Sequence, residues 1–304
     1  MSNLLKLTTE TRNERSMNID NMSTIDILTT INNEDKLVAH CVERVLPEIE
    51  RTVDAVCRAI KQGGRVFYVG AGTSGRIGIL DAVECPPTYS TPPDVFQAVL
   101  AGGVQAFEQA AEGAEDDLEQ GAKDLAMRKV TAADVVIGIT ASGRTPYVIG
   151  ALQYARRIGA FTVGLSSNAD SEISAYADIK IEVITGPEVI TGSTRMKAAT
   201  AHKLILNMIS TASMIKVGKV YENLMVDLKV SNHKLMERAK NIVVTITGIT
   251  PTEAEQVLEK TNYQVKPAIV MVKAGVDYDE ANALIREADG FVRKAIELAR
   301  LRRR

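Results

Sequence analysis

Five short apolar runs are spaced along the first two thirds of the chain, and each is followed by a turn rich in glycine or serine. Continuous apolar runs bounded by such turns are typical of strands buried in a parallel sheet. We therefore predict strands at residues 65–69, 95–100, 134–140, 161–165 and 179–183. Helical patterns between most of these runs predict right-handed crossovers and an α/β fold, a doubly wound parallel sheet flanked by helices. Ligands of such sheets lie beyond the carboxyl ends of the strands.

Amphipathic helical patterns precede the first strand. One begins at Ser23, and a longer one begins at Asn33 and ends at the Gly63–Gly64 pair, which favours a helix C-terminus. We expect residues 1–55 to form a helical segment that packs on the core or on a second subunit. The sheet domain then spans residues 56–220.

The pattern changes after Tyr221. No further repeat of strand, glycine-rich loop and helix follows, and residues 230–304 carry short helical patterns instead. We predict a small C-terminal all-helical domain at residues 221–304.

A distinctive polar stretch, residues 186–203, follows the last predicted strand. Gly192 marks a turn, and Ser193 and Thr194 are predicted to cap a long helix that ends near Gly218. A helix start with hydroxyls, outward backbone N–H groups and a cation, Lys197, is suited to an anion. An ordinary capped helix with solvated cations explains the same residues equally well.

Two further loops share the tripeptide Ser-Gly-Arg directly after a predicted strand. The candidate anion-binding residues in them are Gly72, Thr73, Ser74, Ser142, Gly143, Arg144 and Thr145. The first loop also matches the dinucleotide pattern Gly-x-Gly-x-x-Gly. We reject that interpretation because the next strand ends in Ala101-Gly102-Gly103, where a dinucleotide fold needs an acidic residue for the ribose. The same loop chemistry suits a smaller phosphate ester.

Composition excludes several classes of protein. The chain has 304 residues, 45% of them hydrophobic, and a net charge of −2, so nothing favours disorder or nucleic-acid binding. No apolar run is long enough to span a membrane, and the polar N-terminus does not resemble a secretion signal. Three cysteines without metal spacing indicate reduced thiols and a cytoplasmic location, and three scattered histidines give no metal site. No cofactor is expected.

Two acidic stretches are candidates for acid–base chemistry. Glu84 follows an apolar helical segment that we expect Pro86–Pro87 to end, with apolar surroundings near the ligand edge. A glutamate at a helix end is more often simply solvated. In residues 111–117 the sequence alone does not choose among the acidic side chains, which are Glu112, Glu115, Asp116 and Asp117.

Residues 186–203 closely resemble the motif of the N-acetylmuramic acid 6-phosphate etherase and glucokinase regulatory protein family, and the resemblance covers nearly the whole chain. It implies a sugar isomerase (SIS) fold and a UBA-like C-terminal helical bundle. It also implies that the Ser-Gly-Arg loops bind a phosphosugar and that Glu84 and Glu115 are catalytic. The regulatory branch has a longer chain with two SIS domains, whereas this chain has room for one. Both acidic segments are present, which favours the enzyme branch.

The implied reaction explains the need for two carboxylates. In the ring-opened sugar the C1 aldehyde acidifies the C2 proton, which a base removes while an acid protonates the departing lactyl ether oxygen. Water then adds at C3, giving N-acetylglucosamine 6-phosphate and D-lactate. We expect Glu84 to be the acid, with a pKa raised by apolar burial, and Glu115 to be the base. The resemblance also implies a homodimer, and the two long apolar-faced helices at residues 33–62 and 193–218 are the expected contact faces.

Two other functions remain open. A sugar-phosphate isomerase or deaminase on the same fold would use a base beside a ring-opened sugar without cleaving an ether. A non-catalytic sugar-phosphate sensor would bind the ligand and convert nothing. Release of D-lactate distinguishes both from an etherase.

Overall fold

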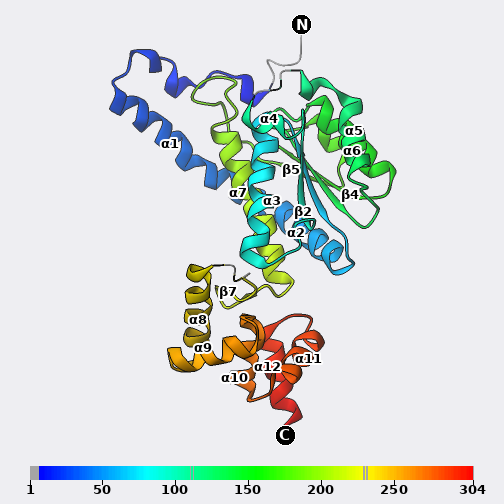
Figure 1. The fold of residues 1–304 in the computed structure, drawn as a ribbon. Helices are drawn as coiled ribbons and strands as arrows, with labels where there is room; N and C mark the ends of the chain where they lie inside the picture. The colour runs from blue at the N-terminus through cyan, green and yellow to red at the C-terminus, as the bar shows by residue number, and fades with distance from the viewer. Residues whose placement is uncertain (1–6, 110, 112, 229, 231, 304) are drawn as a thin grey trace. The chain divides into compact units, whose positions relative to one another are not determined.

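The computed structural model describes residues 7–109, 111, 113–228, 230 and 232–303. They form two compact units (Figure 1). The first contains the chain up to Val83 and residues 94–210, and the second contains residues 84–93 and 211–304. The predicted N-terminal segment therefore belongs to the same unit as the sheet, and the helical unit also includes residues 84–93 and 211–220.

The first unit is built on a five-stranded parallel sheet with the order β2-β1-β3-β4-β5. The strands are β1 (Val66–Gly70), β2 (Phe96–Leu100), β3 (Val135–Ile139), β4 (Phe161–Ser166) and β5 (Ile179–Glu182). All five lie where the apolar runs predicted them, and the doubly wound parallel fold is confirmed. The central strands β1 and β3 are buried along their whole length, which explains why their sequences do not alternate with polar residues.

Helices cover both faces of this sheet. The helices that begin in this unit are α1 (Thr24–Glu43), α2 (Leu46–Lys61), α3 (Gly72–Tyr89), α4 (Gln105–Glu108), α5 (Leu118–Met127), α6 (Pro146–Arg157) and α7 (Lys197–Lys216), and of these α1 extends away from the sheet (Figure 1). Phe67 and Val69 pack into the cluster that includes the buried face of α6, and between them Tyr68 points to the opposite face, against Gly78 of α3. Alternation along one strand thus supplies both layers, with α5 and α6 on one side and α3 and α7 on the other (Figure 1).

The N-terminal helices divide at a different point from the one predicted. We expected a new helix at Asn33, but α1 continues through that position and the break falls at Arg44–Val45. Pro47 explains the break, because its ring nitrogen cannot donate to the preceding turn, whereas a proline is well tolerated in the first turn of a new helix such as α2. The predicted helix end at Gly63 is confirmed, since Gly63 has a φ of +80°.

The end of α3 also differs from the prediction. Pro86–Pro87 do not end the helix, which continues to Tyr89 with both prolines inside it. Ser90 follows with a φ of +49°, so the backbone turns out of the helix there rather than at the prolines.

The second unit is helical apart from a short hairpin, β6 (Val220–Tyr221) and β7 (Leu224–Met225), which the apolar pattern did not predict. Its other elements are α8 (His233–Thr247), α9 (Pro251–Lys260), α10 (Val265–Ala274), α11 (Tyr278–Glu287) and α12 (Val292–Arg302). Their inward faces form one apolar core of alanine, valine, leucine and isoleucine side chains. The predicted C-terminal helical domain is confirmed.

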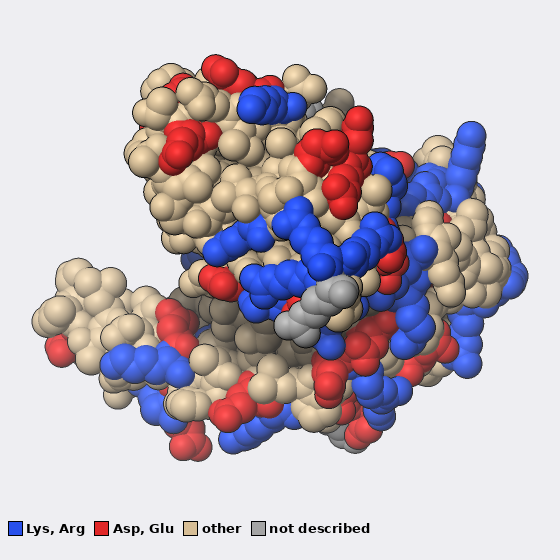
Figure 2. Space-filling view, turned by 90° about the horizontal axis from the view of Figure 1, so that it is seen from below, with Lys and Arg blue, Asp and Glu red and all other residues tan. Residues whose placement is uncertain are grey.

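The surface gives two further facts. The helices of the described residues all lack the combination of length and apolarity that a membrane span requires. On the face shown in Figure 2, lysine and arginine side chains are interspersed with aspartate and glutamate side chains, so neither charge covers that face.

Candidate active site

The strand order creates a switch point between β1 and β3. The chain leaves β1 toward β2 on one side and then returns to place β3 on the other side of β1. Loops after two such strands diverge and leave a crevice at the carboxyl edge of the sheet. The two Ser-Gly-Arg segments follow these two strands: residues 72–76 form the start of α3 rather than a loop, and residues 142–146 form the loop that leads into α6. The fold therefore brings together the loops that the sequence selected.

A small cavity of about 200 Å³ lies beside the first of these loops. Its lining residues are Ala71, Gly72, Arg76, Ala101, Ala106, Ala111, Gly113 and Glu115. The Arg76 guanidinium donates to the carbonyl oxygens of Ala106 (2.8 Å) and Phe107 (2.9 Å), which ties α4 to the start of α3. Glu115 lines the same cavity as Gly72 and Arg76, so this carboxylate lies beside the glycine-rich start of α3.

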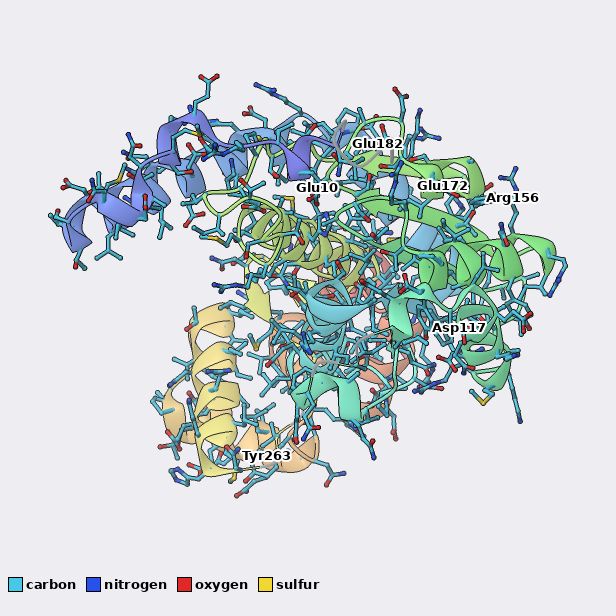
Figure 3. All side chains as sticks on the ribbon, turned by 90° about the horizontal axis from the view of Figure 1, so that it is seen from above. Glu10, Asp117, Arg156, Glu172, Glu182 and Tyr263 are labelled. Carbon is cyan, nitrogen blue, oxygen red and sulfur yellow. The ribbon has the colours of Figure 1, made fainter. Side chains whose placement is uncertain are left out.

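Glu115 itself lies in the short 3-10 helix η5 (Ala114–Asp116), and its side chain is exposed. The left-handed Gly113 begins this turn, and the carboxylate of Asp117 accepts the N–H of Gln120 to begin α5 (Figure 3). Of the acidic residues left open by the sequence, Asp117 thus has a capping role, Glu115 lines the cavity, and Glu112 lies outside the described residues.

The second loop carries a cluster of hydroxyls. Thr140 at the end of β3 is buried, and its hydroxyl lies 2.7 Å from that of Thr145 and 3.2 Å from that of Ser142. Ser142 and Thr145 are half-buried and so remain accessible from the loop side. Three hydroxyls in contact can rotate to offer several donors to one anion.

Residues that follow β4, together with Glu182 of β5, fix the shape of this loop. A Cβ atom at Gly143, which has a φ of +75°, would overlap the side chain of Ser171, so no other residue fits there. The carboxylate of Glu182 in turn accepts the N–H groups of Asp170 and Ser171, each at 3.1 Å (Figure 3). Glu182 thus supports the hydroxyl loop indirectly.

The third predicted loop is built differently from our expectation. Ser193 and Thr194 do not cap the helix, because α7 begins at Lys197. The buried carboxylate of Glu188 caps it instead and accepts the N–H groups of Lys197 and Ala198, each at 2.9 Å. We expected the N-terminus of this helix to face a bound anion. Its N–H groups instead donate to a carboxylate of the protein itself, that of Glu188.

Lys197, for which the sequence left an anion-binding and a solvated cation open, is not solvated. Its side chain is 1% exposed and its ammonium lies 2.7 Å from the equally buried carboxylate of Glu34 on α1. Arg15 contacts the same carboxylate. Although burial raises the pKa of Glu34, the hydrogen bonds from Lys197 and Arg15 outweigh it and the pKa is lowered. In this structure Lys197 therefore joins α7 to α1 rather than facing the loops.

An N-terminal strap, residues 7–16, lies against these loops and was not predicted. The Thr9 hydroxyl accepts from Asn168 (3.1 Å) after β4, and the Thr9 carbonyl accepts from Gly192 (3.2 Å). The Ser16 hydroxyl donates to the carbonyl of Val189 at 2.7 Å. No local pattern announces such contacts, since the partners are more than 150 residues apart in sequence.

The remaining predicted residues are placed as follows. Thr73 and Ser74 lie half-buried in the first turn of α3, and Arg144 and Thr194 are half-buried in their loops. Glu84 lies on α3 within the second compact unit, and its side chain is exposed. The prediction that apolar neighbours bury Glu84 is therefore wrong for the single chain.

Two buried titratable groups lie on α3 and α7, Asp81 and His202. Asp81 accepts from Tyr68 (2.8 Å), Asn207 (2.6 Å) and Ser210 (3.0 Å), and burial raises its pKa. Burial also lowers the pKa of His202 to about 4, so this imidazole is neutral where it contacts the Ser167 hydroxyl at 3.0 Å. Both groups connect α7 to the sheet or to α3.

Known proteins show what this arrangement is similar to. Residues 48–156 match the glucokinase regulatory protein N-terminal SIS domain, residues 114–211 match the SIS domain, and residues 222–274 match the C-terminal lid domain of glucokinase regulatory protein. An N-acetylmuramic acid 6-phosphate etherase of Bacillus subtilis (strain 168) is 56% identical over 295 residues, 97% of each chain. The chain belongs to the N-acetylmuramic acid 6-phosphate etherase family.

Other similarities are consistent with this membership. An etherase of Clostridium beijerinckii is 51% identical over 97% of each chain. A solved phosphoheptose isomerase from Francisella tularensis superposes with a TM-score of 0.52 at 18% identity, covering 64% of this chain and 100% of that one. At that identity the superposition shows the SIS fold alone.

Proposed function

We propose that this member of the etherase family cleaves the D-lactyl ether of N-acetylmuramic acid 6-phosphate, a carbon–oxygen lyase reaction of amino-sugar catabolism and cell-wall recycling. The observation that carries the proposal is the cavity that joins Glu115 to the glycine loop at the switch point. The relative that is 56% identical over 97% of both chains supports the choice of substrate. Incubation with N-acetylmuramic acid 6-phosphate should release D-lactate and N-acetylglucosamine 6-phosphate in equal amounts. Substrate binding without lactate release would instead support a sensor or an isomerase.

The proposed mechanism uses only side chains of the protein. Glu115 removes the C2 proton of the ring-opened sugar, and Glu84 donates a proton to the ether oxygen as lactate leaves. Exposure of both carboxylates in one chain suggests that the substrate or a second subunit completes their surroundings. A drier site would favour the protonated form of the acid.

We propose that the 6-phosphate is bound by hydroxyls and helix N-termini rather than by a cluster of cations. The candidate groups are the Ser142–Thr145 hydroxyls, the backbone of Gly143, the α3 start at Gly72–Ser74, and Ser193 and Thr194. Lys197 is a less direct candidate, because it is buried against Glu34.

Ser142→Ala should weaken binding of 6-phosphosugars while leaving the turnover of bound substrate nearly unchanged. Removing one hydrogen bond to a charged group costs about 1.5–3 kcal/mol, which corresponds to a rise in Kd of roughly 10- to 150-fold. Titration calorimetry with N-acetylglucosamine 6-phosphate measures this change. Thr245→Ala, which removes an exposed hydroxyl on α8, is the matched control and should bind normally. An unchanged affinity in Ser142→Ala would place the phosphate elsewhere.

We propose that the protein is a cytoplasmic homodimer. None of its three cysteines forms a disulfide, as is usual in a reducing compartment. The side chains of Ile25, Leu28 and Leu37 on α1 are 68%, 56% and 38% exposed. Apolar side chains repeated along one exposed helix are typical of an interface.

Sedimentation at low micromolar concentration should therefore give a dimer. Ile25→Glu/Leu28→Glu should shift the protein to monomer, because two charges would be buried in the interface. Leu301→Glu, at an equally exposed position on α12, should leave the dimer intact. A wild-type protein that is monomeric and fully active would contradict the proposal.

A further inference from the structure

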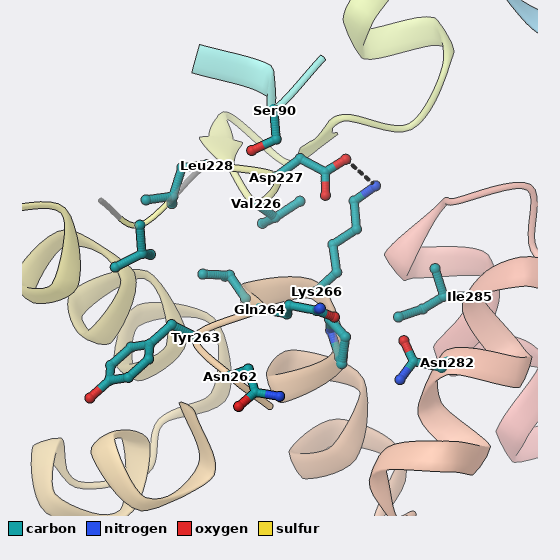
Figure 4. Close-up of a pocket in the computed structure, with 13 residues that line it drawn as sticks. Ser90, Val226, Asp227, Leu228, Asn262, Tyr263, Gln264, Lys266, Asn282 and Ile285 are labelled. Carbon is teal, nitrogen blue, oxygen red and sulfur yellow. Dashed lines mark ion pairs between the residues drawn. The ribbon is translucent and has the colours of Figure 1, made fainter. Parts of the chain in front are cut away.

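A cavity of about 430 Å³ lies within the second compact unit (Figure 4). It is enclosed by Ser90 at the end of α3, the segment after β7, the N-terminal end of α10 and the facing side of α11. None of its lining residues belongs to the phosphosugar loops. Its volume is in the range of sites for small metabolites.

A cationic cluster borders this cavity: two of its members, Asp227 and Lys266, line the cavity, and the third, Lys219, does not. The ammonium of Lys266 lies 2.8 Å from Oδ2 of Asp227, and the ammonium of Lys219 lies 2.9 Å from the same oxygen. The three side chains are 9%, 23% and 26% exposed, in the order Lys266, Asp227, Lys219. Two ammonium groups thus share one carboxylate oxygen, and the cluster carries one positive charge in excess.

This excess charge is unfavourable in the structure as it stands. Burial lowers the pKa of Lys266, and the nearby Lys219 acts in the same direction. No other acidic side chain lies within ion-pair distance of either ammonium in the part of the chain that the structure describes. A second anion beside Lys266 would balance the charge and relieve the repulsion between the lysines.

The start of α10 adds donors to the same wall. Gln264 is the N-cap of this helix, but its side chain makes no capping hydrogen bond. The backbone N–H groups of Val265 and Lys266 have no acceptor among the described residues, and both residues line the cavity. Free N–H groups at a helix N-terminus favour an anion, so helix and lysine act on the same side of the cavity.

The backbone around the cavity is strained. Seven non-glycine residues of the described chain have a positive φ, and three of them line this cavity: Ser90 (+49°), Asn262 (+49°) and Tyr263 (+58°). Left-handed geometry is tolerated by asparagine but is costly for a tyrosine. The turn at 262–263 sets the amides of Asn262 and Gln264 at the cavity, opposite Asn282 on α11 (Figure 4).

We propose that this cavity binds a small hydroxylated oxyanion, a carboxylate or phosphate ester of metabolite size, with the anionic group held by Lys266 and the N-terminus of α10. Hydroxyls of the ligand hydrogen-bond to the amide of Asn262 and to the remaining donors and acceptors of Gln264 and Asn282, since Gln264 Oε1 already accepts from the Tyr278 hydroxyl and Asn282 Nδ2 already donates to the Tyr278 carbonyl. The site is separate from the proposed etherase chemistry and does not depend on it.

The test is a titration of the full-length protein followed by the backbone amide NMR signals of residues 262–266. Three probes are added separately: inorganic phosphate, D-lactate and N-acetylglucosamine 6-phosphate. Saturable shifts of these signals at millimolar ligand or below are expected. A response to all three probes would show that the cavity recognises the oxyanion itself. A response to only one probe would show that the ligand belongs to the chemical class of that probe: inorganic phosphate, hydroxy-carboxylate or phosphate ester. No saturable shift with any probe would overturn the proposal.

Variants separate the cavity from other anion sites. Lys266→Met should weaken the affinity at these signals by about tenfold or more, because a charge-assisted hydrogen bond is lost. Lys219→Met removes the excess charge but keeps the Lys266–Asp227 pair, so it should fold normally and show a similar loss. Lys273→Met, at an exposed position of the same helix, should bind as the wild type does. Unchanged affinity in Lys219→Met would contradict the role of the excess charge and overturn the proposal.

Discussion

Glu115→Gln is expected to abolish both deuterium exchange at C2 and D-lactate release, whereas Glu84→Gln is expected to abolish lactate release alone. Removal of the C2 proton needs only the base and the aldehyde, so it can continue and reverse when the acid is missing. Glutamine keeps the shape of each side chain but can neither accept nor deliver the proton. A positioned acid or base typically contributes about 10²–10⁴-fold, so each loss is measurable.

The assay runs in heavy water and follows deuterium at C2 of recovered substrate together with lactate. Asp116→Asn is the matched control, because Asp116 is the exposed neighbour of Glu115 in η5 but does not line the cavity. It should retain both activities. Exchange that survives in the Glu115 variant and is lost in the Glu84 variant would reverse the two roles. Full activity in either variant would remove that residue from the mechanism.

The sheet was predictable because its strands are continuous apolar runs separated by glycine and serine turns. Each observed strand begins within one residue of its predicted start. For example, β1 spans Val66–Gly70, and the predicted strand spanned residues 65–69. Parallel strands place the segments that follow them at one edge of the sheet. The sequence therefore predicted that the two Ser-Gly-Arg segments lie near each other. Local sequence decided these features, and the structure agrees with them.

The contacts around residues 186–203 were not predictable in the same way. Ser193 and Thr194 have the sequence signature of a helix cap, yet Glu188 takes the role from a position well before the helix. Capping rules consider only the residue that immediately precedes a helix. The sequence carries one signal of this role, which is that Glu188 precedes the apolar Val189 and Ile190. Apolar neighbours favour burial, and a carboxylate is rarely buried without a partner, so Glu188 could have been expected to have one.

Lys197 illustrates the same limit over a longer distance. Its partner Glu34 is 163 residues away in sequence and lies in the middle of α1. The sequence of this amphipathic helix does not distinguish Glu34 from a charged residue on its exposed face. Charge type and helix position alone favoured a solvated cation near an anion. Only the packing of α1 against α7 shows that both side chains are buried.

Lys197→Met is expected to destabilise the protein strongly, because it removes the buried cation of the Glu34 carboxylate and leaves Arg15 and Asn13 as its partners. Removing one member of a buried ion pair costs about 3–5 kcal/mol, and the remaining Arg15 contact favours the lower end. Chemical unfolding, with D-lactate release assayed in parallel, measures the effect. Lys203→Met, at an exposed position of the same helix, should change the free energy of unfolding by less than about 0.5 kcal/mol.

The double variant Glu34→Leu/Lys197→Met tests whether the loss comes from the unpaired charge. Replacing both partners by apolar side chains should recover most of the stability, because no buried carboxylate then remains without its buried lysine. The pH dependence gives an independent check. Since the pKa of Glu34 is lowered in the folded protein, the stability it contributes is present above the ordinary pKa of glutamate and is lost as the pH falls through the folded value. That acid-side loss should disappear in the double variant. A single variant as stable as the wild type would show that the pair contributes nothing to folding.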